Sequence, residues 1–400
     1  MAKLSNIDLW NKLRASYPQF KSHTSEGTAE LFTERGYEKL KNWDHTALQD
    51  FFELSMRVYL NKINISLAKD NLSNNGFGES YDMPWGYYIQ RIAINSIKPI
   101  SPKYKNLKNG DSPDQFVVRK PDVFERFWVQ NFDYQSLLTM PDDFAYKQLF
   151  VAEYGMDDYA TGLVQGLDNG YVIQKYENKL EAINSGINST VTPLRETQKM
   201  VSALSDIPTD DELRNFILSV NNVVEAMEIG PQCNAFNAEH YSTVQDRSRL
   251  KLLIRPGIKN AIKVRTLSGA FNRDDLSFDV DLVVVPHFGG LVPYKEEGYE
   301  TQLYPVYDEL GAVIGFSETE GQKGKENVTV EEADVFWKDP NENTYAILAD
   351  KGLISEFTQN SYRMGIARNE AGLYNNYWAS SPNNSIIFDP IYNCVLFQKE

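Results

Sequence analysis

Hydrophobic residues recur at helical spacing over residues 157–185, where they predict one long helix. Asp157 or Asp158 can cap its first turn, and Gly186 suits the position that follows its last turn. At 1.5 Å per residue the helix would be about 43 Å long. The apolar positions that share the spacing are Leu163, Leu167, Ile173, Tyr176, Leu180 and Ile183.

A second helix is predicted to begin after Thr209, because Thr209 and Glu212 can satisfy each other's backbone donors as a capping box. It should end before Gly230 and Pro231. Residues 1–70 carry loosely spaced apolar positions among many charges, which predicts amphipathic helices in an arm or entry segment.

Alternating strand-like positions over residues 86–99 and 115–128 flank a polar, turn-rich stretch and predict a long hairpin. Each arm of about 14 residues would reach roughly 45 Å at the rise of a strand. A two-stranded ribbon alone is marginally stable in water, so this hairpin should lie against another surface, in the same chain or in a neighbour.

The second half of the chain predicts a separate α/β core. Residues 248–256 and 277–286 read as strands on either side of a short helix near "TLSGAFN", and residues 304–316 read as a hairpin. A polar linker that is exposed or mobile is expected at 318–327. The remaining predicted strands are 345–350, 362–368 and 385–397.

Composition narrows the class of protein. A chain of 400 residues exceeds the length at which one hydrophobic core stops growing, so more than one packing unit is expected. The formal net charge of -15 has the wrong sign for a protein whose main task is to bind nucleic acid. With two cysteines (Cys233 and Cys394), no apolar signal segment and no membrane-length apolar run, we expect a soluble protein assembled in a reducing cytoplasm.

The stretch "ARNEAGLYNNYW" at 367–378 is rich in aromatic and amide side chains. Tyr374, Tyr377 and Trp378 could stack on a sugar, which leaves a carbohydrate-binding surface protein as one alternative function. Aromatic residues in such a run are more often packing residues. We therefore assign all three to packing and expect Trp378 to be buried.

Asp279 and Asp281 supply the other alternative, a magnesium-dependent nucleotidyltransferase. Alternating aspartates on one strand face can chelate Mg²⁺ beside a triphosphate, and a Ser-Gly pair precedes them. The simpler interpretation is an exposed strand start before the apolar run Val283–Val285. No other catalytic or metal-binding motif is present, so we expect no catalytic residues, no metal and no cofactor.

The order of the predicted elements resembles the Hong Kong 97-type capsid fold, an α+β fold, and the sequence is similar to the major capsid proteins of small short-tailed phages of the phi-29 type. "PDDFAYKQLFVAEYGMDDYATGLVQ" at 141–165 resembles the approach to the spine helix of that family. Residues 247–272 resemble its axial domain, and "ILADKGLI" at 347–354 resembles its C-terminal strands. The run Arg-Asn-x-x-Gly-Leu-Tyr at 368–374 is the most specific match.

The resemblance implies a division of the chain into five parts. These are an N-terminal arm (1–75), an extended loop (76–135), a peripheral domain with the spine helix (136–205), an axial domain with an insertion at 289–343 (206–344), and C-terminal strands of the peripheral domain (345–400).

The function implied is that of a major capsid protein, which self-assembles as pentamers and hexamers into the icosahedral shell of a phage head. The shell would enclose double-stranded DNA without sequence-specific binding and would be assembled in the host cytoplasm. The implied partners are further copies of the chain, a portal, and scaffolding or inner head proteins, with no membrane.

Charge indicates how the hairpin would dock in such a shell. Residues 86–128 hold eight basic and four acidic residues, while the whole chain is at -15. We expect the basic hairpin to dock on an acidic surface of the next subunit, with the approach to the long helix, including Asp157 and Asp158, as the candidate. The candidate basic residues are Lys103, Lys105, Lys108, Arg119 and Lys120.

Overall fold

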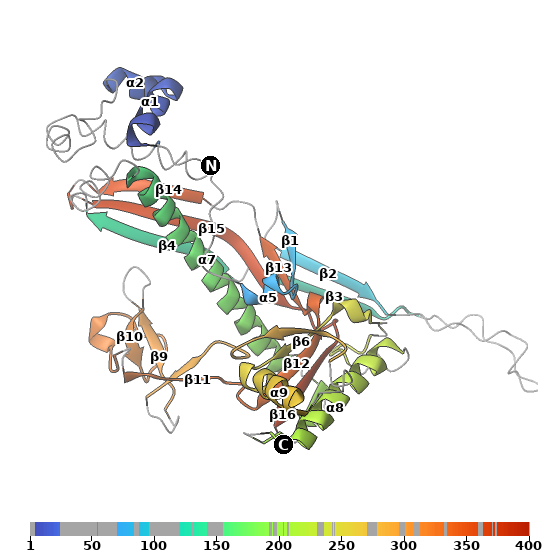
Figure 1. Cartoon of the computed structure of the whole chain (residues 1–400). Helices are drawn as coiled ribbons and strands as arrows, with labels where there is room; N and C mark the ends of the chain where they lie inside the picture. The colour runs from blue at the N-terminus through green and yellow to red at the C-terminus, as the bar shows by residue number, and fades with distance from the viewer. Residues whose placement is uncertain are drawn as a thin grey trace, which may run out of the picture.

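The computed structural model of the chain contains helices and strands in an α+β arrangement (Figure 1). None of the helices among the described residues is long and apolar enough to cross a membrane. The structure describes residues 5–24, 54, 70–83, 88–95, 120–129, 132–141, 155–191, 194, 198–202, 204–205, 208–229, 236–241, 243, 245–269, 278–295, 301–307, 313–331, 334–358, 363–369, 371–372 and 374–399.

The predicted long helix is α7, Gly155–Ile187, and it lies along one of two five-stranded sheets (Figure 1). We call this sheet the first sheet. Its strand order is β1-β13-β15-β14, and β4 also pairs with β15. Its strands are β1 (Glu79–Asp82), β4 (Phe132–Pro141), β13 (Ile354–Thr358), β14 (Arg363–Asn369) and β15 (Tyr374–Phe388).

The other sheet, called the second sheet, has the strand order β5-β16-β12-β6-β7. Its strands are β5 (Lys199–Ser202), β6 (Leu250–Ile254), β7 (Asp281–Val284), β12 (Thr344–Asp350) and β16 (Cys394–Lys399). The strands β6 and β7 are parallel and joined through α9 (Pro256–Gly269), which confirms the predicted strand, helix, strand unit. Pro256 at the first helical position explains the sharp start, since proline is preorganised there.

Each face of the second sheet is covered by helices. On one face, Leu252 and Leu348 pack against α9 and against α8 (Asp210–Glu228), whose buried Phe216 and Val224 lie in the same cluster. The capping box of Thr209 and Glu212 that begins α8 is present as predicted. The second sheet is therefore the middle layer of a three-layer unit.

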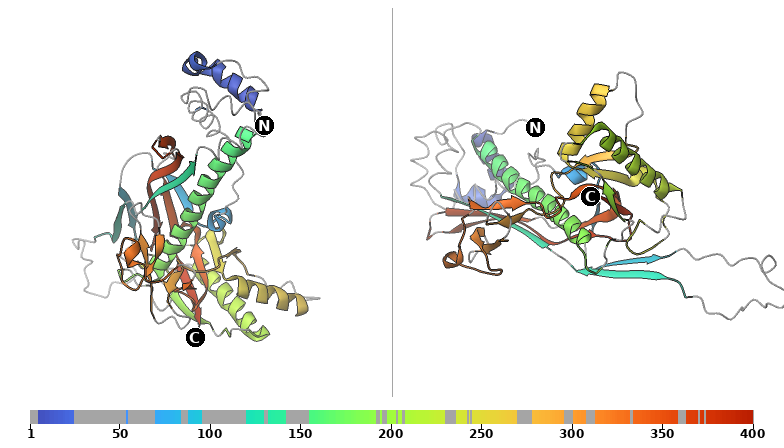
Figure 2. Two further views of the ribbon diagram at one scale, coloured as in Figure 1. Left: turned by 90° about the vertical axis from the view of Figure 1, so that its left-hand side faces the viewer. Right: turned by 90° about the horizontal axis from the view of Figure 1, so that it is seen from below.

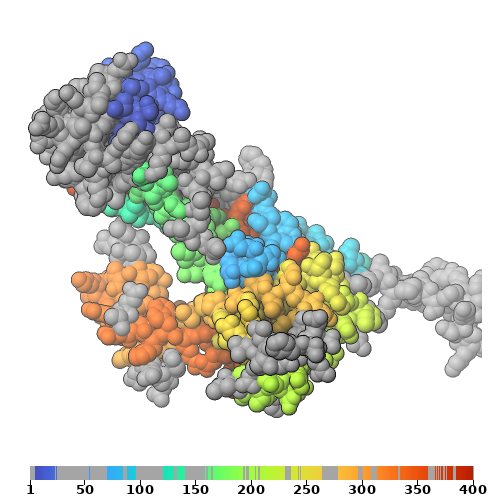
Figure 3. All heavy atoms as spheres, in the orientation of Figure 1, coloured from blue at the N-terminus to red at the C-terminus, as the bar shows by residue number. Residues whose placement is uncertain are grey.

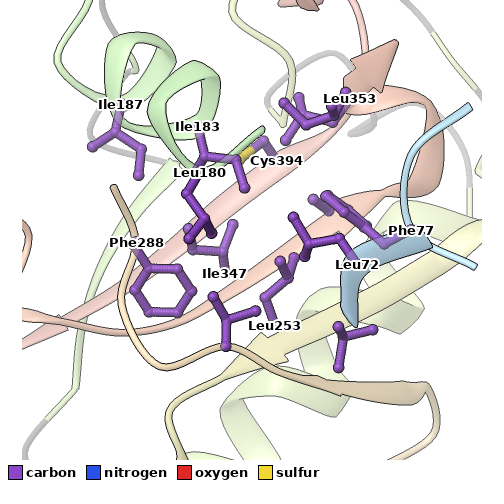
Figure 4. Close-up of a cluster of buried hydrophobic side chains, with 14 of the residues drawn as sticks. Leu72, Phe77, Leu180, Ile183, Ile187, Leu253, Phe288, Ile347, Leu353 and Cys394 are labelled. Atoms are coloured by element: carbon purple, nitrogen blue, oxygen red, sulfur yellow. The ribbon is translucent and has the colours of Figure 1, made fainter. Parts of the chain in front are cut away.

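On the other face, Ile347 and Leu253 pack against the C-terminal half of α7 and against the segment that holds the short helix α5 (Asn71–Asn74) (Figure 4). Leu180 and Ile183 of α7 point into this cluster, as does Phe77. A single long helix thus packs against both sheets, so it fixes the first sheet relative to the second.

Two sequence expectations in this region are wrong. Gly186 does not end α7 but lies inside it, where it is buried. A Cβ at this position would come within 2.2 Å of the Phe388 ring. Glycine is needed for this close approach and not for a left-handed cap. The predicted strand 385–397 is two strands, since β15 ends at Phe388 and β16 begins at Cys394 after a turn.

Residues 292–338 carry two small two-stranded sheets and a small hydrophobic cluster of their own. The strand β8 (Val292–Tyr294) pairs with β11 (Phe336–Lys338), and β9 (Tyr304–Tyr307) pairs with β10 (Val313–Ser317), which confirms the predicted hairpin at 304–316. Phe316, Leu303 and Val330 form the cluster. In Figure 3 this segment, in orange, is a lobe at one side of the molecule.

The predicted hairpin is present as β2 (Tyr88–Ile94) and β3 (Val123–Val129), paired antiparallel over seven residues each (Figure 2). The right-hand view of Figure 2 shows the two strands running out from the body. The rest of the predicted arms lies outside the described residues. At the N-terminus the helices α1 (Asn6–Ser16) and α2 (Pro18–His23) confirm the predicted helical character as far as His23. Most of the prediction for residues 1–70 falls on 25–53 and 55–69, outside the described residues.

Candidate assembly surfaces

The β2–β3 hairpin presents one face to the body and leaves the other uncovered within the described structure. Because successive side chains of a strand alternate in direction, every second residue lies on the outer face. Six large apolar side chains on that face are between 47% and 70% exposed. We call this set the outer face; it consists of Tyr88, Ile92, Ile94, Val123, Phe127 and Val129.

A groove of about 500 Å³ lies between α7 and β4. Gly162, Gly166 and Gly170 stand four residues apart on the helix side of this groove, and a Cβ at either of the first two would meet nothing within 4 Å. Leu137 and Leu138 of β4 are exposed along the opposite side. The glycines thus keep this side of α7 open. The groove also contains Tyr134, Ser136, Asp158, Leu163 and Leu167.

A buried ionic cluster joins α7 to the first sheet and to the start of α5. The Nζ of Lys179 lies 2.5 Å from Oδ2 of Asp70 and 3.0 Å from Oε2 of Glu356, and Lys175 Nζ is 2.5 Å from the other oxygen of Glu356. The Lys179 side chain is 1% exposed. Burial raises the pKa of Asp70, but the charge and hydrogen bond of Lys179, with hydrogen bonds from Ser73, outweigh it and hold the pKa below its ordinary value.

The predicted docking residues fall on both described and undescribed parts of the chain. Lys103, Lys105, Lys108 and Arg119 lie outside the described residues. Lys120 is exposed just before β3. Asp157 belongs to the first turns of α7, and Asp158 next to it is exposed and lines the groove between α7 and β4. One predicted acidic residue therefore lies beside a groove that sequence reasoning did not foresee.

The aromatic run that begins β15 alternates across the first sheet. Tyr377 is 1% exposed, whereas Trp378 is 37% exposed and lies across from Gly365 of β14. The prediction that Trp378 is buried is wrong, because the register of β15 turns Tyr377 to the inside instead. Tyr374 is half-buried, and its hydroxyl accepts a 2.8 Å hydrogen bond from Asn369. A buried Tyr377 offers no face to a sugar, so the structure does not support the carbohydrate-binding alternative.

Asp279 and Asp281 each lie beside a basic side chain. Asp281 Oδ2 is 2.5 Å from the Nζ of Lys251, and Asp279 Oδ2 is 3.8 Å from a guanidinium nitrogen of Arg247. Within the described ranges no three His, Cys, Asp or Glu side chains gather as a metal site would require. Asp281 begins β7, and Val283, two residues later, is buried. This agrees with the simpler interpretation, in which the aspartates lie at an exposed strand start before an apolar run.

Sequence reasoning missed the residues that join the hairpin and α7 to the body. Arg91 and Arg126 were counted only as charges of the hairpin, and Lys179 was not singled out. Their partners lie far away in the sequence, at Asp389, Glu239 and Glu356. Basic residues at inward positions of an amphipathic strand or helix were the only signal that could have found them.

Comparison with known proteins gives the family. A sequence model described as Phi29-like phage major capsid protein matches residues 26–398. No curated protein sequence matches the chain.

Two solved structures with a similar fold come from phages. The capsid structure of Staphylococcus phage Andhra is 14% identical with a TM-score of 0.58, and the match covers 84% of this chain and 86% of that chain. A structure of the head fiber and inner core protein of native bacteriophage P68 is 13% identical with a TM-score of 0.57, covering 85% of this chain and 86% of that one. The chain therefore belongs to the Phi29-like phage major capsid proteins, has the Hong Kong 97-type fold, and is a shell protein that assembles with its own copies in the phage capsid.

Proposed function

We propose that copies of this chain form pentamers and hexamers by docking the hairpin of one copy on the groove between α7 and β4 of the next. The observation that carries this proposal is the outer face, where six large apolar side chains of β2 and β3 are 47% to 70% exposed. A contiguous exposed apolar surface of this kind marks a contact site, and among the described residues the body of the chain covers only the inner side of the ribbon.

Shape and charge support the groove as the receiving surface. It is lined by glycines and by exposed leucines, so it offers an apolar hollow for the side chains of the outer face. Asp158 stands at its side, and the segment 86–128 carries eight basic and four acidic residues. Opposite charges at the rim of a contact orient the partners and raise the association rate. Lys103, Lys105, Lys108, Arg119 and Lys120 remain the predicted basic side of this contact.

The division of the chain into arm (1–75), extended loop (76–135), peripheral domain (136–205 and 345–400) and axial domain (206–344) is part of the same proposal. In this division the lobe at 292–338 is an insertion in the axial domain. Both peripheral segments contribute to the first sheet, through β4 on one side and β13, β14 and β15 on the other, which supports their assignment to one domain. The same segments also supply β5, β12 and β16 to the second sheet, where β12 pairs with β6 of the axial domain.

The wider role is proposed from the family to which the chain belongs. We infer a structural protein without catalytic residues or cofactors, assembled in the host cytoplasm, whose partners besides its own copies are a portal and scaffolding or inner head proteins. The shell encloses double-stranded DNA without sequence-specific contacts. A net charge of -15 also disfavours close contact between the chain and the DNA phosphates.

The outer face is tested with the double variant Ile92→Ser and Phe127→Ser. Both side chains are exposed in the single chain, so the subunit should fold with an unchanged thermal midpoint but form no shells in light scattering and negative-stain microscopy. The matched control is Val191→Ser with Val201→Ser, which removes two exposed apolar side chains away from the hairpin and should assemble normally. Shells formed at the wild-type rate by the hairpin variant would contradict the proposal.

The charges are tested separately with Lys103→Glu, Lys105→Glu and Lys108→Glu together. Assembly at low salt should slow, and the difference should shrink at high salt, because screening acts over about 10 Å at 0.1 M. Asp157→Lys with Asp158→Lys should restore part of the rate. An unchanged rate in the triple variant at low salt would show that the predicted basic residues do not guide docking.

A further inference from the structure

The inner face of the hairpin meets the body in three successive layers. From the body outward, the cross-strand pairs are Ile89 with Trp128, Arg91 with Arg126, and Ala93 with Phe124. Ile89 packs against Phe357 and Ile387 of the first sheet, and the Phe124 ring meets Tyr241 edge-on with centroids 6.0 Å apart. Two apolar layers thus enclose a layer that consists of two arginines directly opposite each other.

Arg91 contacts several elements of the body at once. Its Nε is 3.6 Å from Oδ2 of Asp389 in the turn before β16, and a terminal nitrogen donates to Ser355 Oγ of β13 at 3.0 Å. The guanidinium carbon lies 5.2 Å from the ring centroid of Tyr81 and 5.7 Å from that of Phe357. The Asp389 side chain is 2% exposed, and burial raises its pKa although the charge of Arg91 lowers it.

Arg126 contacts a different element. Its terminal nitrogen donates to Oε1 of Glu239 at 3.0 Å, in the described segment 236–241, and its guanidinium lies over the Phe124 ring at 5.4 Å. The side chains of Arg126 and Glu239 are 27% and 23% exposed. The two arginines therefore connect the two strands of the hairpin to two separate carboxylates of the body.

Stability alone does not explain this layer. Like charges directly opposite in a sheet are destabilising, and partly buried ion pairs contribute little net stability compared with apolar side chains of similar size. A third apolar layer would also hold the hairpin against the body. Apolar contacts have no preferred direction, however, so the hairpin could slide along the body. Fixed, directional hydrogen bonds from two guanidinium groups define one orientation.

We propose that Arg91 and Arg126 are positioning residues that fix the angle at which the hairpin leaves the body, so that its outer face is presented to the next copy. The role in assembly rests on the proposed docking of the hairpin. The angle itself is a property of the single subunit and is measured there.

The experiment measures the angle in the unassembled full-length subunit. Spin labels are placed at Ile94→Cys on the hairpin and Val201→Cys on β5, two exposed positions. Cys233→Ser removes one native thiol, and Cys394 is buried, with its pKa raised by burial to about 12, so it does not take a label. Pulsed electron paramagnetic resonance then gives the distance distribution between hairpin and body.

The wild type should give one narrow distance peak. Arg126→Glu should lose that peak to a broad distribution, because the new carboxylate faces Glu239, while circular dichroism and the thermal midpoint of the body stay unchanged. Glu239→Arg in the same chain should restore the narrow peak, which a loss of packing alone would not allow. Gln90→Ala is the control, because Gln90 points away from the body on the same ribbon, and this variant should keep the peak.

Assembly rates of the same charge variants in the unlabelled chain, which keeps Ile94 and Val201, separate the two proposals. If Arg126→Glu keeps the narrow peak, or if Glu239→Arg does not restore it, the positioning role is overturned. Another outcome is that the peak broadens in Arg126→Glu and is restored by the charge exchange while shells form at the wild-type rate in every variant. In that case the positioning role of Arg91 and Arg126 stands, and docking through the hairpin is overturned. Both proposals are supported if Arg126→Glu loses the narrow peak and the shells, and if Glu239→Arg in the same chain restores both.

Discussion

Replacement of Lys179 by methionine tests how much the buried ionic cluster stabilises the subunit. Methionine keeps an unbranched stem of similar length but removes the ammonium group. Lys179 is 1% exposed and contacts both Asp70 and Glu356, so the variant leaves two buried carboxylates with Lys175 as the nearby cation. Removal of one partner of a buried pair costs about 3 to 5 kcal/mol, and we expect a loss of that size in the free energy of unfolding.

The pH dependence of this loss has a definite sign. In the wild type the pKa of Asp70 is lower in the folded chain than in the unfolded one. Its contribution is therefore present above the unfolded pKa of about 4 and is lost as the pH falls through the folded value. Without Lys179 the effect of burial dominates and the folded pKa lies above the unfolded one. The variant then gains stability as the pH falls, so its difference from the wild type narrows from about pH 7 to about pH 4.

The assay is urea unfolding of the unassembled subunit at a series of pH values. Lys175→Met is the matched control, since Lys175 is 23% exposed and its removal leaves Glu356 paired with Lys179, so about 1 kcal/mol or less is expected. Asp70→Asn added to Lys179→Met should recover part of the loss, because the amide oxygen can still cap α5. A Lys179→Met loss equal to that of the control, or one that does not change with pH, would refute the reasoning.

Three further outcomes are expected. Gly186→Ala should lower the thermal midpoint and impair folding, because the new Cβ would lie 2.2 Å from the Phe388 ring, which packs against the buried cluster, whereas Gly162→Ala, in open space, should be neutral in the same melt. Tyr377→Ala should cost about 3 to 5 kcal/mol in urea unfolding, as a buried aromatic residue does, and Trp378→Ala distinctly less; the reverse order would show that the register of β15 is wrong. Asp279→Ala with Asp281→Ala should leave assembly intact, and magnesium-dependent nucleotide transfer by the wild type, lost in this variant, would contradict a purely structural role.

The helices could be predicted from the sequence because their signals are local. The spacing of apolar residues in α7 and the capping box at Thr209 lie within a few residues of each other. Strands such as β4 and β5 were missed because they are defined by partners in β15 and β16 that lie far away in the chain. A four-residue strand such as β5 has no period of its own long enough to recognise.

The direction in which side chains point was the second feature that could not be predicted from the sequence. Tyr377 and Trp378 are both aromatic, so alternation alone could not tell which one faces inward. Gly186 looked like a helix end because glycine is common there, yet the reason for it is the nearby ring of Phe388, which only the fold reveals. The charges of the hairpin were visible in the sequence, but the pairing of Arg91 and Arg126 with body carboxylates was not.

The pattern of the hairpin strands has a consequence for the symmetry of the contact. Both faces of β2 and β3 carry apolar residues, as in strands that are covered on both sides, but within the described chain only the inner face is covered. Under the proposed docking, the second cover comes from another copy of the same chain. The outer face and the groove between α7 and β4 are different surfaces, so the contact that we propose is head-to-tail and generates a ring only when the rotation between neighbours closes. In that arrangement the rotation depends on the angle between hairpin and body, and the proposed positioning role of Arg91 and Arg126 predicts that loss of their layer yields open chains in place of closed rings.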